Sequence, residues 1–350
     1  MTTNAPLATA TILDVAKLAG VSRTTVSRAM NEPDSVSDSL LARVRSAAAE
    51  LNYVPSTAAR SLRSGRTGTI ALLVGDISQP FHGVLAKAVS RAAGDRGMNL
   101  VLGDLDHSDE RLQEFLQRLP KQGIDGIIIA TADNVSSEAT RAAIAEAQGQ
   151  GVPVVLSMPE PTLPEVAALS LDYTEVGRLA TASLLQSGRA VVMIVGKEDS
   201  NFSRLLIAGY EKALADDERV DGGVQLRRRV VEGAHNYDES ARIVSELLDN
   251  GEPLDGLVVA SMPMALGAIR AIEERGLSMP FDVALVVCED VPMAAQMRPA
   301  ITAVGTDPEE NGEGVVRLLV ASIRGEAITM REPVSVRTIE RETSRTSLTG

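Results

Sequence analysis

The sequence predicts an α/β protein in which a small helical head precedes a larger body built on parallel sheets. Residues 11–31 contain two amphipathic helical stretches separated by a tight turn at Gly20-Val21. From Thr69 onward, short β-rich runs alternate with helical stretches, which is typical of parallel strands covered by helices. At 350 residues the chain exceeds one ordinary domain, so we expect two or three folded units.

The stretch TILDVAKLAGVSRTTVSRAMN, residues 11–31, predicts a helix-turn-helix. Ala16 is small where the two helices cross, Gly20 can adopt the backbone angle that the turn needs, and Val26 can pack between the helices. Ser22 stands where a helix N-cap belongs, because its oxygen can accept a backbone N–H of the next turn. A simple helical hairpin could share the apolar spacing, but it would rarely carry such a polar second helix.

The second helix predicts a surface that reads DNA. Its outward residues can hydrogen-bond phosphates or base edges: Arg23, Thr24, Thr25, Ser27, Arg28 and Asn31. Arg23 and Thr24 begin this helix, whose first turn reaches deepest into the major groove. An arginine bonded to a guanine contributes about 1–3 kcal/mol against the wrong base. Any one of these residues could be a solvated helix position, but the set together predicts nucleic-acid binding. The expected phosphate contacts are Ser22, Thr25, Ser27 and Asn31.

A third helix over about 37–51 supplies apolar residues at helical spacing to cover the first two. Asn52 can end it in a left-handed conformation, and Pro55 prevents its continuation. A very short helical segment, Thr57–Leu62, then opens at Ser56, and it is marginal alone because helix nucleation is costly. We therefore expect a DNA-binding head at 10–54, a hinge helix and linker at 55–68, and a body at 69–343.

The body alternates strand and helix candidates throughout. The strands are expected at IALLV, LVLGDL, GIIIA, VPVVL, AALSL, AVVMIV, GLVVA and VALVV. The helices are expected to begin near His82, Asp109, Ser136, Tyr173, Ser203, Tyr237, Met264 and Pro308. About ten strands with helices between them fit two lobes better than one sheet.

The net charge of −13 is divided unevenly along the chain. Residues 1–66 hold eight Lys and Arg against five Asp and Glu, a net charge of +3, which leaves −16 for the remainder. A basic head on an acidic body orients the molecule toward DNA. The single cysteine, Cys288, excludes an internal disulfide and is expected to be a buried apolar group. No export signal and no apolar run of about 20 residues is found, so we expect a cytoplasmic protein without membrane contact.

Residues 11–31, followed by VSDSLLARVRSAAAELNYVPSTAARSLRSGRTGTIALLVGDISQPF, resemble the LacI/GalR (lactose-repressor) family of bacterial transcription regulators. The resemblance covers nearly the whole chain and is strongest from Thr11 to Phe81. It implies a body like that of a periplasmic sugar-binding protein, with two α/β lobes joined by three crossover strands. The first lobe would comprise about 69–171 and 303–326, and the second about 172–302 and 327–343.

The resemblance also assigns the hinge. Residues 55–62 match the family's hinge helix, which Ser56 opens. Ala58 and Ala59 are small enough for two symmetry-related hinge helices to approach each other closely. Leu62 matches the leucine that wedges into the minor groove at the operator centre. Taken alone it would more often be a packing residue, but the match of its neighbours favours the wedge. Such a wedge favours a flexible central step such as CG. Two hinge helices imply a homodimer on a palindromic double-stranded DNA operator, and the last twenty residues lack the leucine heptads of a tetramerising tail.

The family binds a small-molecule effector between its lobes. The matched or nearby residues expected at that site here are Asp76, Phe81, His82, Asp172, Tyr173, Phe202, Arg204 and Glu289. Other positions depart from the family pattern, with Met158, Leu206 and Ser261-Met262 where polar or charged groups are usual. Buried sugar hydroxyls need polar partners, so an ordinary free hexose is not expected. His82 could instead be a histidine at the start of a helix beside the site.

Two interpretations of the body stay open. In the first, the site holds a less polar or differently shaped ligand whose preference for one lobe arrangement moves the hinge helices. In the second, small-molecule control has been replaced by a protein partner or lost. An enzyme is the main alternative of another class, but no Gly-rich phosphate loop, metal-spaced cluster or Ser/His/Asp order stands out. No catalytic residue, metal or cofactor is therefore expected. A transport-linked binding protein would need an export signal and no basic head.

Overall fold

The computed structural model describes residues 10–31, 33–53, 65–131, 133, 135–157, 163–217, 228–251 and 253–345. The chain separates into two units at Thr67 and Gly68, within the expected linker, and these units are the head and the body. The expected hinge helix, with Ser56, Ala59 and Leu62, lies outside the described residues. No helix in the described ranges is long and apolar enough to cross a membrane.

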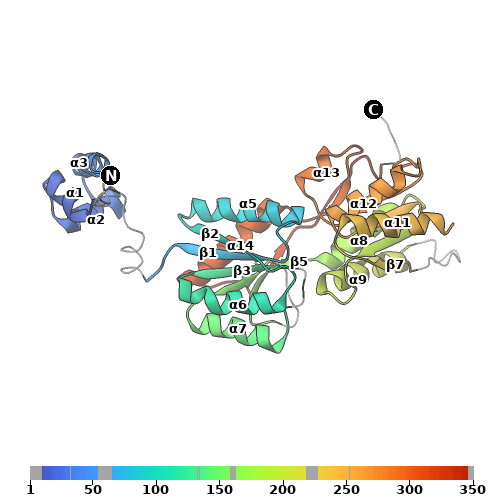
Figure 1. The fold of residues 1–350 in the computed structure, drawn as a ribbon, viewed down its shortest axis with the longest axis horizontal. Coiled ribbons are helices and arrows are strands. Elements are labelled where there is room, and N and C mark those ends of the chain that lie inside the picture. Colours follow the sequence, from blue (N-terminus) through green and yellow to red (C-terminus); the bar gives the residue numbers. More distant parts are fainter. Residues whose placement is uncertain are drawn as a thin grey trace, which may run out of the picture. The chain divides into compact units, whose positions relative to one another are not determined.

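The head is the predicted three-helix unit (Figure 1, blue). It contains α1 (Ile12–Ala19), α2 (Arg23–Asn31), a 3₁₀ turn (Pro33–Ser35) and α3 (Asp38–Glu50). Thr11 and Asp14 form a capping box at the start of α1, and Gly20 ends the helix with φ 63°, ψ 39°. Val26 of α2 is fully buried between α1 and α3. The helix-turn-helix prediction is confirmed in these details.

The first lobe of the body is built on a six-stranded parallel sheet with the order β11-β5-β4-β3-β1-β2. Its strands are β1 (Thr69–Val74), β2 (Asn99–Asp104), β3 (Gly126–Ala130), β4 (Val154–Leu156), β5 (Ala167–Leu171) and β11 (Arg331–Val334). The helices are α5 (Pro80–Asp95), α6 (Asp109–Arg118), the 3₁₀ turn η2 (Pro120–Gln122), α7 (Glu138–Gly149) and α14 (Pro308–Arg324).

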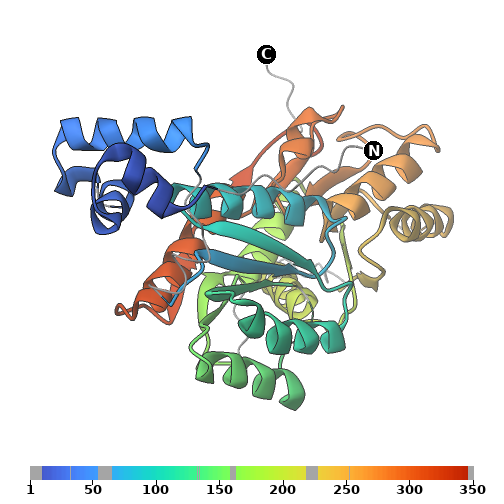
Figure 2. The ribbon, with the colours of Figure 1, turned by 60° about the vertical axis from the view of Figure 1, so that its left-hand side comes forward.

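Both faces of this sheet are covered, which explains why its central strands β1, β3 and β4 are continuously apolar (Figure 2). In β1, Ile70 and Leu72 pack with α5 and α14, while Ala71 and Leu73 pack with α6 and α7. Successive side chains of a strand point to opposite faces, so one apolar run supplies both cores.

The second lobe repeats this plan with the sheet order β12-β10-β9-β8-β6-β7, parallel except for the edge strand β12. Its strands are β6 (Val191–Val195), β7 (Val230–Glu232), β8 (Gly256–Val259), β9 (Ala284–Val287), β10 (Thr302–Gly305) and β12 (Arg337–Ile339). Its helices are α8 (Tyr173–Leu185), α9 (Asn201–Ala215), α11 (Tyr237–Asp249), α12 (Met262–Glu273) and α13 (Pro292–Gln296).

Helices α8 and α9 cross at a pair of glycines. A Cβ at Gly177 would collide with the Leu206 carbonyl, and a Cβ at Gly209 with the Thr174 carbonyl. The two backbones are therefore in direct contact. The adjacent Tyr210 is buried, and its hydroxyl donates to the Val191 carbonyl at 2.9 Å.

The chain passes between the lobes three times, at Asp172, at Thr306-Asp307 and at Ser335-Val336. The expected boundaries need correction at the second and third passages. Residues 303–305 belong to β10 and pair with β9 in the second lobe, and β11 pairs with β5 in the first lobe. Both strands are short, and β11 holds a proline at the sheet edge, so neither has the apolar run that marks a central strand.

Candidate functional site

The head presents a polar and basic face on α2. Ser22 is its N-cap residue, because its hydroxyl oxygen accepts the Thr25 N–H at 3.0 Å. The side chains of Ser22, Arg23, Thr24 and Arg28 are exposed. Thr25 and Ser27 are half-buried on the flank of the same helix, and Asn31 is its last residue.

Arg23 and Arg28 carry no ion pair with any described residue of the chain. Their guanidinium groups are thus available for an external anion, with five N–H donors each. Exposed arginines at the start and middle of the second helix of a helix-turn-helix are suited to base edges and phosphates.

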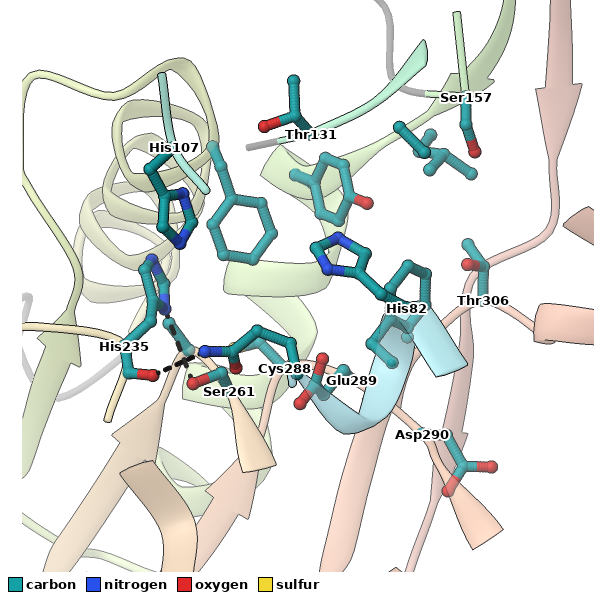
Figure 3. A pocket seen from close by; sticks show the side chains of 18 residues that line it. His82, His107, Thr131, Ser157, His235, Ser261, Cys288, Glu289, Asp290 and Thr306 are labelled. Carbon is teal, nitrogen blue, oxygen red and sulfur yellow. Dashed lines mark hydrogen bonds between the residues drawn. The ribbon is translucent and has the colours of Figure 1, made fainter. Parts of the chain in front are cut away.

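The body holds a cavity of about 100 Å³ between its two lobes (Figure 3). Residues at the carboxyl ends of both sheets line it, including Thr131 after β3, Ser157 after β4, Ser261 after β8, Glu289 after β9 and Thr306 after β10. In open α/β sheets this edge is where ligands bind, because loops and helix N-termini converge there.

Aromatic side chains are concentrated around this cavity. Phe81 of α5, Tyr173 of α8 and Phe202 of α9 all line it. Phe202 lies edge-on to Tyr173, with ring centroids 4.8 Å apart and an angle of 81° between the planes. Phe81 and Tyr173 also pack against the cores of both lobes, so the aromatic residues form part of the junction.

All three histidines of the chain line the same cavity. His82 and His107 come from the first lobe and His235 from the second, and Figure 3 shows the rings of His107 and His235 side by side. His235 lies directly over Gly196, where any Cβ would collide with its ring. The sequence interpretation included only His82. His107 and His235 follow β2 and β7, and that placement at strand ends was the available signal.

The surroundings of the three imidazoles differ. Burial lowers the pKa of His82, whose Nδ1 donates to the Asp76 carbonyl at 2.6 Å. Burial also lowers the pKa of His235 to about 4, so this ring is neutral at pH 7. The hydrogen bond to Asp133 raises the pKa of His107, and the two side chains lie 3.0 Å apart.

Glu289 is a carboxyl group placed in the cavity by the end of β9. Burial raises its pKa to about 7, against the opposing effect of a hydrogen bond from the Met262 N–H at the start of α12. Burial likewise raises the pKa of Tyr173 and of the Cys288 thiol, each with a further contribution from the Glu289 charge. Cys288 is buried, as the sequence predicts, and does not act as a thiolate at pH 7.

One direct hydrogen bond joins the lobes across the cavity. The side-chain amide of Gln79 donates to the carbonyl oxygen of His235 at 2.9 Å. Gln79 precedes α5 of the first lobe, and His235 precedes α11 of the second. A molecule seated in the cavity would therefore contact residues from both sides of this bond.

The structure brings five of the eight expected effector residues to the cavity: Phe81, His82, Tyr173, Phe202 and Glu289. The other three do not line this cavity in the structure. Asp76 turns back to accept the Ser78 N–H at 2.7 Å, and Asp172 caps α8 by accepting the Glu175 N–H at 2.9 Å. Arg204 is exposed on α9 and does not line the cavity.

Among the residues that differ from the family pattern in the sequence, Met158 lies outside the described residues, whereas Ser261 lines the cavity. Leu206 is fully buried in the core of the second lobe. Among the described residues, no group of three or more His, Cys, Asp or Glu is arranged to hold a metal ion.

Two family models match the chain. Residues 11–56 match the model of bacterial regulatory proteins, lacI family. Residues 70–327 match the model of the periplasmic binding protein domain. The first match covers the helix-turn-helix, and the second covers most of the body.

Similar proteins include the HTH-type transcriptional regulator CelR of Thermobifida fusca, 34% identical over 334 residues that make up 91% of this chain and 93% of that protein. A CelR–cellobiose complex is similar in structure, with a TM-score of 0.67, 30% identity and coverage of 95% of this chain and 99% of that chain. The lac repressor dimer bound to operator and the anti-inducer ONPF has a TM-score of 0.81 at 26% identity, covering 96% and 99% of the two chains.

Proposed function

The chain belongs to the lacI family of bacterial regulatory proteins, and we propose on that premise that it represses transcription by binding a palindromic operator. The observation that carries this proposal is the exposed face of α2, with Arg23, Thr24 and Arg28 on a helix that Ser22 caps. Arg23 and Arg28 read base edges in the major groove, and the hydroxyl groups fix the register on phosphates.

The test is selection of genomic fragments by the full-length protein, followed by gel-shift titration of the selected duplex at increasing salt. The logarithm of the affinity falls linearly with the logarithm of the salt concentration. Arg23→Ala weakens specific binding by about tenfold or more and relaxes one base position. Arg270→Ala, an equal charge change on α12 of the body, is the matched control and leaves specific binding unchanged. Failure of the protein to select any duplex at low salt contradicts the proposal.

We propose that the protein acts as a homodimer. An edge strand of the first sheet, β2, leaves one side without a neighbouring strand, and its Val101 and Leu102 are 41% and 42% exposed. Unpaired strand edges with apolar side chains favour association with another chain. Sedimentation equilibrium gives twice the chain mass if this is correct, and a monomer would contradict it. Each operator half-site would then bind one head, with Leu62 wedged at the centre.

We further propose that a small molecule in the cavity between the lobes controls DNA affinity. Both lobes contribute residues to this cavity, so a ligand there has different contacts in different lobe arrangements. Relatives are named for complexes with cellobiose and with an anti-inducer. Thermal-shift screening of metabolites against the full-length protein identifies a binder, since a ligand at a hundred times its Kd adds about 2.7 kcal/mol. If a protein partner alone regulates DNA affinity, no metabolite will raise the Tm.

We propose no catalytic activity for this chain. Relatives carry names of transcriptional regulators. A repressor of this kind works in the cytoplasm, where it meets the DNA.

A further inference from the structure

Glu289 is the uncompensated charge of the cavity. No lysine or arginine is among the residues that line it. The neighbouring Asp290 is paired with Arg341 at 2.8 Å, and His107 is paired with Asp133. Within the described chain, Glu289 receives one backbone N–H, that of Met262, and no ion pair. Its charge is therefore without a cationic partner in this structure.

Aromatic residues are enriched in the cavity that Glu289 lines, relative to the composition of the chain. Only eight residues of 350 are Phe or Tyr, and three of them line the cavity. The faces of such rings carry partial negative charge and attract a cation within about 6 Å. The Glu289 charge acts on Tyr173, so the carboxyl group and the ring pair of Tyr173 and Phe202 belong to one environment.

The cavity wall offers hydrogen-bond acceptors that have no donor among the described residues. Because a carbonyl can only accept, His82 donates from Nδ1 to Asp76 and presents an unprotonated Nε2. Two nearby donors are already used: the Gln79 amide bonds to the His235 carbonyl, and the Thr131 hydroxyl to Asp133 at 2.5 Å. The hydroxyl groups of Ser157, Tyr173 and Thr306 also line the cavity and can either donate or accept. A ligand that supplies hydrogen-bond donors is therefore matched by the Glu289 carboxyl group and by Nε2 of His82.

We propose that the effector is a small organic cation, a protonated amine or quaternary ammonium with an apolar body. Its positive group lies against Glu289 and the rings of Tyr173 and Phe202, and its apolar part fills the cavity toward Phe81 and Leu171. This inference rests on the proposed effector control and specifies the chemical class of the ligand. It also gives a reason why the pKa of an unliganded Glu289 lies near neutrality: the carboxyl group has lost its water and has no counter-ion.

The test compares three probes of similar size and different charge: benzylammonium, benzyl alcohol and benzoate. Isothermal titration of the full-length protein at about pH 8, where Glu289 is ionised, gives their affinities. Benzylammonium binds about tenfold tighter than benzyl alcohol, and benzoate binds weakest. Glu289→Gln weakens benzylammonium by about tenfold and changes benzyl alcohol by less than about twofold.

Two further variants keep the inference testable. Glu273→Gln changes an exposed carboxyl group on α12 and leaves all three affinities unchanged. Phe202→Leu retains an apolar side chain but removes a ring, so it weakens benzylammonium more than benzyl alcohol and gives an independent measurement if Glu289→Gln does not fold.

Absence of binding by benzylammonium, or equal or tighter binding of the alcohol or of benzoate, overturns the inference. Specific DNA binding is measured on the same preparations. Intact operator binding with no preference for the cation refutes the ligand class alone, whereas loss of specific DNA binding refutes the proposed function.

Discussion

Glu289→Gln is expected to make the body more stable at neutral and alkaline pH. Folding raises the pKa of Glu289 from an ordinary value of 4.5 to about 7, because the group is buried with only the Met262 N–H to stabilise its charge. The folded state then binds more protons than the unfolded state across this interval. Stability accordingly falls as the pH rises from about 4.5 to about 7, and the loss is complete above that range.

The size of the effect follows from the shift. This rise in the pKa of Glu289 lowers the free energy of unfolding by about 3 kcal/mol at pH 8. A glutamine cannot ionise, and its amide oxygen can still accept the Met262 N–H, so the variant avoids the loss. For a body of this length the gain is on the order of 5 °C in Tm.

The assay is differential scanning calorimetry of the full-length protein and the variant at several values between about pH 5 and pH 8. The difference in Tm should grow as the pH rises. Glu273→Gln, an exposed carboxyl group on the same lobe, should give a profile parallel to that of the unaltered protein. A Glu289→Gln profile that is also parallel would show that this group titrates normally and would refute the reasoning.

Three other changes have defined outcomes. Ser22→Ala removes the oxygen that accepts the Thr25 N–H and should cost about 1 kcal/mol in the stability of the head, measured by thermal unfolding followed by circular dichroism. Leu62→Ala should abolish operator bending while sparing non-specific binding; circular-permutation gel shifts that show an unchanged bend would contradict this. Gly209→Ala puts a methyl group against the Thr174 carbonyl and should destabilise the body by about 1–3 kcal/mol, measured by calorimetry. An unchanged stability would show that α8 and α9 can move apart without cost.

Seven of the eight predicted body strands were predictable because their neighbours cover them on both faces, so their residues are almost all apolar. In β3, for example, all five residues are buried. The eighth, β2, lies at a sheet edge with Val101 and Leu102 exposed, and its apolar residues alone gave the prediction. The strands that the sequence interpretation missed lack this signal. In β7 every residue is partly exposed, and β12 pairs at an edge of the sheet with two of its three residues exposed. These strands form because they pair with segments far away in the sequence, and the local pattern of apolar residues does not reveal such pairing.

The candidate ligand site was predictable in part for a similar reason. Phe81, Tyr173 and Phe202 stand at helix starts that follow strands, where side chains converge on the cavity. Asp172 and Arg204 stand at comparable places, but local geometry decides their roles: one caps its own helix, and the other points to solvent. The grouping of His107 with His235 comes from residues over a hundred positions apart, and only the folded arrangement of the two lobes unites them.

The three passages between the lobes are each only one or two residues long. Connections this short cannot extend, so sliding or separating the lobes would disrupt the paired strands that flank them, which are β5, β10, β11 and β12. Rotation of one lobe relative to the other about the three connections is the motion that costs the least free energy, and the body therefore behaves as a torsion joint. A ligand that binds between the lobes would therefore act mainly by changing the angle of rotation between them. Substitutions at Ser335 or Val336, which do not line the cavity, should alter the stiffness of that joint and so the size of the response to a ligand, without changing the residues that contact ligand or DNA.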